Sequence, residues 1–223
     1  MKDRRAVLWD MDGTLIDSEE FHWISWRDTL ASEGVAITRQ QFLSSFGQRN
    51  DSIIPQWLGA AASRERILKI STAKEELYRQ RIRRYGISPL PGVRNWVHRL
   101  QQEGWLQAVA SAAPRANIDT VLEALSARHA FQSIVSAEDV QRGKPDPEVY
   151  LLAAARVGVA PAGCIVVEDA AAGVEGARRA GMRSIGVSHT AKHLPADVAV
   201  PSLESLDANA FESLLQSCPA GTE

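Results

Sequence analysis

Several short apolar runs in the sequence end in, or are soon followed by, residues that could do chemistry on a charged substrate. They comprise four carboxylates, one hydroxyl and one ammonium group: Asp10, Asp12, Glu168, Asp169, Ser111 and Lys144. Asp10 and Asp12 are two positions apart, so at the end of an extended segment both side chains can face the same side. One of them could then attack phosphorus while the other exchanges a proton with the leaving oxygen.

The same residue types indicate a hard metal ion and a phosphate group. Four carboxylates at one rim repel one another unless a cation lies among them. Because no histidine or cysteine cluster accompanies them, the ligands would be oxygens, which suit Mg²⁺ better than Zn²⁺. Ser111 and Lys144 could supply the hydrogen-bond donor and the positive charge that the remaining phosphate oxygens need. The residues therefore predict Mg²⁺ as the cofactor of a site for a phosphate ester.

These residues can meet only if the ends of separate runs lie at one edge of a sheet. The runs are four to six residues long and mostly bounded by charge or glycine, as in strands buried on both faces: 6–10, 106–111, 133–136, 165–168 and 184–187. Between them, apolar residues at helical spacing predict crossover helices. Asp146-Pro147 has the composition of a helix start, with Asp as N-cap and Pro at the first helical position. The alternation predicts an α/β protein with a Rossmann-like, doubly wound parallel sheet, which binds ligands at the carboxyl ends of its strands.

Residues 18–87 break this alternation. They contain no convincing strand, only helical segments such as the one with Trp23, Trp26 and Leu30. The stretch 88–92, Ser-Pro-Leu-Pro-Gly, has the composition of a stiff connector. The sequence therefore predicts an α/β core formed by residues 1–17 and 88–223, with an inserted all-helical cap formed by residues 18–87.

Composition narrows the class of protein. The 223 residues are 45% hydrophobic, and 25 basic against 27 acidic residues give a net charge of −2 without a basic stripe, so we expect no nucleic-acid partner. The N-terminal region lacks the apolar stretch of about 7–15 residues found in signal peptides. No segment approaches the roughly 20 apolar residues of a membrane span, and Cys164 and Cys218 are too few for a disulfide framework. We expect a soluble cytoplasmic protein with no membrane partner, as a monomer or weak homo-oligomer.

Four motifs in order resemble those of the haloacid dehalogenase superfamily. They are Asp10-Met11-Asp12-Gly13-Thr14, Ser111, Lys144 within Gly143-Lys144-Pro145-Asp146-Pro147, and Val167-Glu168-Asp169. The similarity extends from about Val7 to Leu206. It is strongest to the subgroup that contains β-phosphoglucomutase and sugar-phosphate phosphatases, which carry a helical cap after the first motif.

The resemblance implies a role for each motif residue. Asp10 would form an aspartyl-phosphate, and Asp12 would be the general acid and base. Asp10, the backbone carbonyl of Asp12 and Asp169 would hold Mg²⁺, with Glu168 assisting directly or through water. The phosphate-binding group would be formed by Thr14, Ser111, Ala112 and Lys144. Ala112-Ala113-Pro114 departs from the further small polar residues of many relatives, so backbone N–H groups would have to replace a side-chain donor there.

Three cap residues are candidates for contact with the substrate. His22 lies twelve positions after Asp10, where the mutase-like subgroup has a histidine that touches substrate, and Arg49 lies in a loop that resembles that subgroup's substrate-reading loop. Lys74 is the third candidate, with a solvated surface lysine as the alternative interpretation. The Trp-rich surroundings of His22 equally suit a packing role.

The sequence supports a phosphatase acting on a small phosphorylated metabolite, a sugar or polyol phosphate, most strongly. A phosphomutase of the β-phosphoglucomutase type uses the same aspartyl-phosphate and stays open. A receiver-like phosphoacceptor domain, which is not an enzyme, is a remote alternative because its reaction needs neither the helical insertion nor Asp12 as an acid. Asp12 also argues against a dehalogenase or a phosphonatase.

Overall fold

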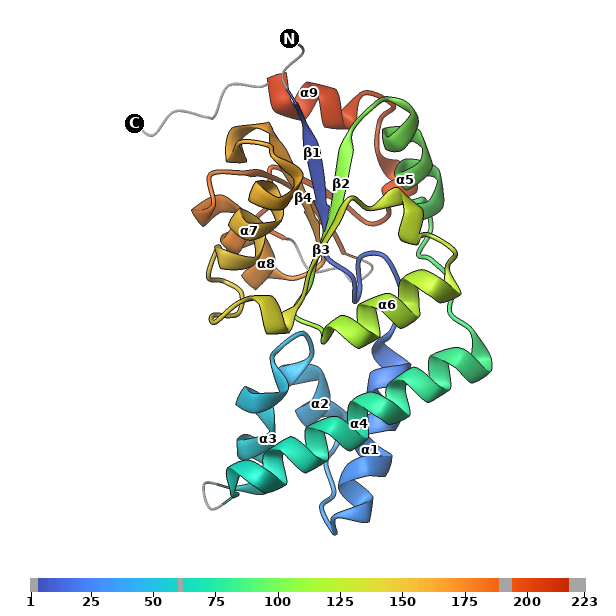
Figure 1. Ribbon diagram of the computed structural model, residues 1–223, viewed down its shortest axis with the longest axis vertical. Coiled ribbons are helices and arrows are strands. Elements are labelled where there is room, and N and C mark those ends of the chain that lie inside the picture. The colour runs from blue at the N-terminus through green and yellow to red at the C-terminus, as the bar shows by residue number, and fades with distance from the viewer. Residues whose placement is uncertain (1–3, 60–61, 189–193, 217–223) are drawn as a thin grey trace.

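The protein is described here by a computed structural model that covers residues 4–59, 62–188 and 194–216, so Cys218 lies outside the described residues. A parallel sheet with the strand order β3-β2-β1-β4-β5-β6 forms its centre. The strands are β1 (Ala6–Trp9), β2 (Leu106–Ala110), β3 (Ser133–Val135), β4 (Cys164–Glu168), β5 (Arg183–Val187) and β6 (Val198–Val200). Helices flank this sheet (Figure 1), which confirms the predicted Rossmann-like α/β fold.

The helices fall into two groups by their place in the chain. Those that accompany the sheet are α5 (Val93–Gln102), α6 (Arg115–Ala124), α7 (Glu148–Val157), α8 (Ala171–Arg179) and α9 (Ala210–Gln216). Those between β1 and β2 are α1 (Glu19–Ser32), α2 (Arg39–Ser45), α3 (Asn50–Leu58) and α4 (Arg64–Tyr85). Single 3₁₀ turns occur at Arg128–Ala130, Ala137–Asp139, Pro161–Gly163 and Leu203–Ser205. None of the helices within the described ranges is long and apolar enough to cross a membrane.

Alternate side chains of β1 enter two separate cores. Val7 and Trp9 pack in a core to which α5, α6 and α9 contribute. Ala6 and Leu8 pack in the other, to which α7 and α8 contribute. A central strand of a doubly wound sheet meets helices on both faces, and all four side chains are accordingly fully buried. This rigid packing fixes the point at which β1 ends and Asp10 follows.

The five predicted strands are all present, with ends within one residue of the apolar runs. The sheet also contains β6, which has only three residues at an edge and an exposed Ala199, so it leaves no apolar run in the sequence. The predicted start of α7 was wrong by one position. The helix begins at Glu148, Pro147 precedes it, and Asp146 Oδ1 accepts a hydrogen bond from the Glu148 N–H at 3.1 Å.

Helices α1 to α4 have a hydrophobic core of their own. Its buried members are Trp26, Leu30, Phe42, Ile53, Ile54 and Ile70. In Figure 1 these helices lie beyond the end of β1 that leads to Asp10. The two chain segments that join them to the sheet lie side by side, because Ile16 bridges to Pro89 and the Leu90 N–H donates to the Leu15 carbonyl at 2.9 Å. We call helices α1–α4 the cap below, and its boundaries at 18 and 87 stay a prediction.

Candidate active site

The backbone holds three site residues at the carboxyl ends of their strands. The Asp10 N–H donates to the Val167 carbonyl and the Ser111 N–H to the Val135 carbonyl, each at 3.0 Å. Each bond continues the sheet pairing by one residue, so these positions share the rigidity of the sheet. Glu168 is itself the last residue of β4. The carboxyl ends of β1, β2 and β4 therefore present these three side chains at one edge of the sheet.

Lys144 joins two of the carboxylates. Its Nζ lies 2.5 Å from Asp10 Oδ1 and 2.5 Å from Glu168 Oε1. Burial lowers the pKa of the Lys144 ammonium, but Asp10 and Glu168 outweigh it and hold this pKa well above the usual range. Lys144 is therefore a permanently charged group beside the predicted nucleophile.

Every oxygen of Glu168 already has N–H or O–H donors. Oε1 accepts from Lys144 and from the Tyr150 hydroxyl, the latter at 2.8 Å. Oε2 accepts from the backbone N–H groups of Asp169 and Ala170, both at 3.0 Å. These bonds to two backbone N–H groups and two side chains order the loop that follows β4. Tyr150 was not predicted from the sequence, because only the packing of α7 brings it to Glu168.

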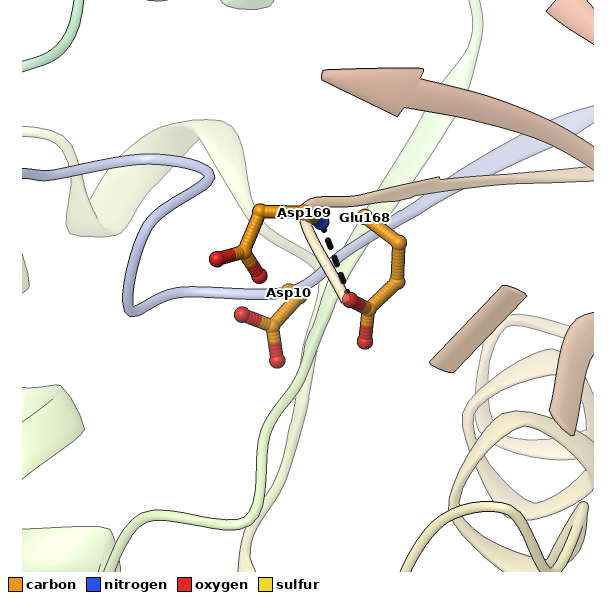
Figure 2. Close-up of side chains that lie close together, drawn as sticks. All are labelled: Asp10, Glu168 and Asp169. Carbon is orange, nitrogen blue, oxygen red and sulfur yellow. Dashed lines mark hydrogen bonds between the residues drawn. The ribbon is translucent and has the colours of Figure 1, made fainter. Parts of the chain in front are cut away.

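Asp169 completes a group of three acids. One carboxylate oxygen from each of Asp10, Glu168 and Asp169 can be chosen so that all lie within 4.8 Å of one another (Figure 2). Burial, followed by the charges of Glu168 and Asp10, raises the pKa of Asp169 to about 9. Burial also raises the pKa of Asp10 to about 7, although Lys144 opposes the shift. Two buried carboxyls that resist ionisation form a place where a cation would be strongly favoured.

Gly13 allows the loop after β1 to approach Asp169. Its φ of +83° is a conformation that side chains disfavour, and a Cβ at this position would overlap the Asp169 carboxylate. The glycine of the first motif is therefore required both by the turn and by the close approach of Asp169, which directly follows β4.

The side chain of Asp12 has partners different from those of Asp10. Its Oδ1 accepts from the Ser18 hydroxyl at 2.5 Å and lies 3.2 Å from His22 Nε2. Burial raises the pKa of Asp12, but His22 and the hydrogen bond of Ser18 outweigh it and bring the pKa below its usual value. Asp12 is thus outside the three-acid group and faces the cap. No pattern in the sequence indicated Ser18 as its partner.

The cap residues His22 and Lys74 lie next to each other. His22 Nδ1 is 2.8 Å from Lys74 Nζ, and the imidazole stacks on Tyr78 with ring centroids 4.1 Å apart. Lys74 is only 2% exposed and pairs with Glu75 at 2.8 Å. The interpretation of Lys74 as a solvated surface residue is therefore wrong, because its charge is compensated inside the cap. The sequence did not indicate Glu75.

Three of the four predicted phosphate-binding residues line one small pocket, which does not include Thr14. Ser111, Ala112 and Lys144 contribute to it from the core and Arg49 from the cap. The Ser111 hydroxyl accepts from the Ala113 N–H at 3.1 Å, which leaves its own proton for another acceptor. Thr14 is fully buried, and its hydroxyl has no hydrogen-bond partner among the described residues. The Thr14 hydroxyl, in the loop that follows Asp10, could therefore form a hydrogen bond with an oxygen atom of a bound ligand.

Arg49 reaches across from the cap to the core. Its Nη1 lies 3.2 Å from the Ala137 carbonyl and 3.5 Å from the Val140 carbonyl, and its Nη2 lies 3.2 Å from Asp51. In this arrangement the guanidinium is satisfied by protein acceptors, while its stem lines the pocket.

Comparison with known proteins places the chain among phosphate-processing enzymes. A family model described as haloacid dehalogenase-like hydrolase matches residues 7–187. Hexitol phosphatase B of Escherichia coli is 34% identical over 91% of this chain and 94% of its own length. A fructose-1-phosphate phosphatase of the same organism is 32% identical over 84% of this chain and 98% of its own length. A solved structure of β-phosphoglucomutase from Clostridium difficile superimposes with a TM-score of 0.85 at 25% identity, covering 95% of this chain and 97% of the mutase.

Proposed function

Because the chain belongs to the haloacid dehalogenase-like hydrolases, we propose that it is a Mg²⁺-dependent phosphatase that cleaves a sugar or polyol phosphate through a phosphoryl group carried by Asp10. One observation carries this proposal. A buried ammonium, Lys144, lies 2.5 Å from Asp10, and a second acid with partners of its own, Asp12, lies two residues further along. The names of the two phosphatase relatives support the substrate class.

The acidic residues fit a divalent cation. Asp10 and Asp169 would hold it with the backbone carbonyl of Asp12, and Glu168 would assist, since its oxygens already accept from Lys144, Tyr150 and two backbone N–H groups. The close approach at Gly13, the raised pKa values of Asp10 and Asp169 and the oxygen-only ligand set all suit Mg²⁺. When bound, the cation neutralises phosphate charge and stabilises the charge that develops on its oxygens.

The reaction uses the two aspartates in turn. A carboxylate oxygen of Asp10 forms a bond to phosphorus while the bond from phosphorus to the sugar oxygen breaks. The sugar oxygen takes a proton from Asp12, and Asp12 then takes a proton from the water that attacks the phosphoryl group on Asp10. Hydrogen bonds from Ser18 and His22 keep Asp12 ionised in the present arrangement, in which it is poised as the base. To act as the acid in the first step, Asp12 must take up a proton from solvent, and the attacking water returns a proton to it in the second step.

Ser111 and Lys144 bind the transferring group. Lys144 is charged and buried, and the Ser111 hydroxyl has a free proton, so together they can hold phosphate oxygens without rearrangement. Ala112 can contribute only its backbone N–H, which leaves this side of the pocket with fewer fixed donors.

The mutase alternative has two observations in its favour and one against it. The shared fold with β-phosphoglucomutase and the basic residue Arg49 in the cap favour it. A mutase must hold a second phosphate and exclude water, whereas Arg49 is already bonded to the Ala137 and Val140 carbonyls and to Asp51. These bonds support the hydrolase, for which Arg49 need not bind a second phosphate.

A phosphate-release screen with Mg²⁺ tests the proposal. The panel contains hexitol phosphates, ketose and aldose phosphates, and β-glucose-1-phosphate with a trace of glucose-1,6-bisphosphate, each with the Asp10→Asn protein as the control. Release of phosphate from several sugar or polyol phosphates, without an isomerised product, is the expected result. Glucose-6-phosphate formed much faster than free phosphate would replace the hydrolase with a mutase.

The balanced charge and the phosphorylated-sugar substrates of the relatives also support a cytoplasmic location and a small metabolite as the partner. We propose a monomer or a weak homo-oligomer, which sedimentation at several protein concentrations would test.

A further inference from the structure

Buried hydrogen bonds connect the cap to the core through Asn117, which pairs with Glu75 and Arg79, and we call this group of three residues the joint. None of the three belongs to the four sequence motifs. Glu75 lies on α4 of the cap, and Asn117 lies on α6 of the core. Asn117 Nδ2 donates to Glu75 Oε2 at 2.5 Å, and Asn117 Oδ1 accepts from Arg79 Nη1 at 2.9 Å. Glu75 is 5% exposed and Asn117 is fully buried. Both ends of one amide are thus bonded to the same cap helix.

The two bonds determine the orientation of the Asn117 amide. If the amide turned over, its oxygen would face the Glu75 carboxylate and its NH₂ group would face the Arg79 guanidinium. Both contacts would then be repulsive, and in a buried site unmatched polar groups are costly. The joint therefore accepts one orientation only, and it forms only when α4 is seated on α6.

Glu75 connects this joint to the predicted acid and base. Its other oxygen, Oε1, accepts from Lys74 Nζ at 2.8 Å and from Asn50 Nδ2 at 2.6 Å. Within the described part of the chain, Glu75 is the one carboxylate that pairs with Lys74. An ammonium only donates hydrogen bonds, so the 2.8 Å contact makes His22 Nδ1 the acceptor, and the proton of the neutral ring lies on Nε2, which faces Asp12.

We propose that Asn117 is a positioning residue that acts through Glu75. It fixes the carboxylate that holds Lys74, and Lys74 in turn fixes the tautomer and place of His22 against Asp12. The packing of α4 against α6 and the placement of His22 against Asp12 for proton transfer are therefore coupled. This inference rests on the proposed phosphatase activity and on the role of Asp12 in it.

Exchange of the hydrogen-bond donor and acceptor between Asn117 and Glu75 tests the joint. In Asn117→Asp two carboxylates face each other, and the link to Lys74 is disturbed. In the double variant Glu75→Gln/Asn117→Asp the amide introduced at position 75 can donate to the carboxylate introduced at position 117. Its oxygen can still accept from Lys74 and Asn50, and Arg79 still meets an oxygen. Asp119→Asn is the matched control, because Asp119 is exposed on the same helix and, among the residues that the structure describes, pairs with Arg115 alone.

Two substrates separate positioning from general stability. With the best sugar or polyol phosphate of the screen, Asn117→Asp should lower kcat/KM about 100-fold, the scale of a loss that follows misplacement of a catalytic group. With p-nitrophenyl phosphate, whose leaving group needs no proton, the loss should be less than about fivefold, since proton donation contributes little there. The double variant should return to within about fivefold of wild type on the sugar phosphate because each donor again meets an acceptor.

The outcomes are distinct. Equal losses on both substrates, or no recovery in a double variant whose melting temperature matches wild type, would overturn the inference. If Asn117→Asp does not fold, Asn117→Ala removes both bonds without adding charge and should show the same substrate difference. Wild-type protein that releases no phosphate from any ester would instead refute the proposed function itself, before Asn117 is tested.

Discussion

Lys144 Nζ lies 2.5 Å from Asp10 Oδ1, and the same ammonium lies 2.5 Å from Glu168 Oε1. The side chains of Lys144, Asp10 and Glu168 are each at least 89% buried by this contact and their surroundings. A single cation therefore compensates two buried carboxylates, in addition to its proposed contact with phosphate.

Lys144→Ala should be destabilised most when metal is absent. Removal of one partner from a buried ion pair typically costs about 3–5 kcal/mol because a charge is left uncompensated. Added Mg²⁺ should recover part of this loss by taking the place of the ammonium among the acids. Melting temperatures in EDTA and in Mg²⁺ measure the difference, and Arg142→Ala is the control because its side chain is 72% exposed. An equal loss in both conditions would contradict a shared electrostatic site.

Gly13→Ala should weaken Mg²⁺ binding by displacing the Asp169 carboxylate, so that more Mg²⁺ is needed for turnover. The change introduces both an unfavourable φ and a clash, and Gly34→Ala separates these effects because Gly34 has a φ of +72° with open space around it. Both variants should lose about 1–2 kcal/mol of stability from the backbone conformation. Only Gly13→Ala should require much more Mg²⁺ for activity, which a Mg²⁺ titration of turnover measures. Full activity of Gly13→Ala at the wild-type Mg²⁺ concentration would argue against Asp169 as a metal ligand.

Asp12→Ala should affect substrates according to their leaving group. General acid and base catalysis contributes about 10²–10⁴-fold, and a sugar alkoxide needs the proton far more than nitrophenolate does. kcat/KM, which reports the transfer of the phosphoryl group to Asp10, should therefore fall much more with a sugar phosphate than with p-nitrophenyl phosphate. Losses of the same size on both would show that Asp12 does something other than transfer a proton.

Glu75 should make the fold sensitive to acid. Burial raises the pKa of its carboxyl, but the charge of Lys74, the nearby His22 and the hydrogen bond of Asn50 outweigh it and bring the pKa to about 2, below the ordinary 4.5. A group with a lowered folded-state pKa stabilises the fold above its unfolded pKa and loses that contribution as the pH falls toward the folded pKa. The melting temperature of wild type should thus fall toward that of Glu75→Gln between pH 4.5 and 2. A constant difference between the two proteins over this range would contradict the assignment.

The sequence predicted those parts of the molecule whose position depends on buried strands. The apolar runs that became β1, β2 and β4 are buried on both sides, so their ends, and with them Asp10, Ser111 and Glu168, could be placed. The edge strand β6 escaped prediction because it has three residues with little burial.

Partners that depend on packing between helices could not be predicted. Tyr150 reaches Glu168 only through the packing of α7, and the Glu75–Asn117 bond exists only because α4 lies against α6. Local sequence around Glu75 and Lys74 is that of an ordinary charged helix face. Their burial follows from the position of the whole cap, which no local pattern encodes.

Capture of the phosphoryl group on Asp10 tests the central claim most directly. Wild-type protein is mixed with its best phosphate ester and Mg²⁺, quenched in acid during turnover, digested and analysed by mass spectrometry, with Asp10→Asn as the control. The account predicts one phosphoryl group on the peptide that contains Asp10, no such peptide from Asp10→Asn, and no phosphate release by that variant. Turnover by Asp10→Asn at more than about 1% of the wild-type rate, well above the remnant expected after loss of a nucleophile, would contradict it.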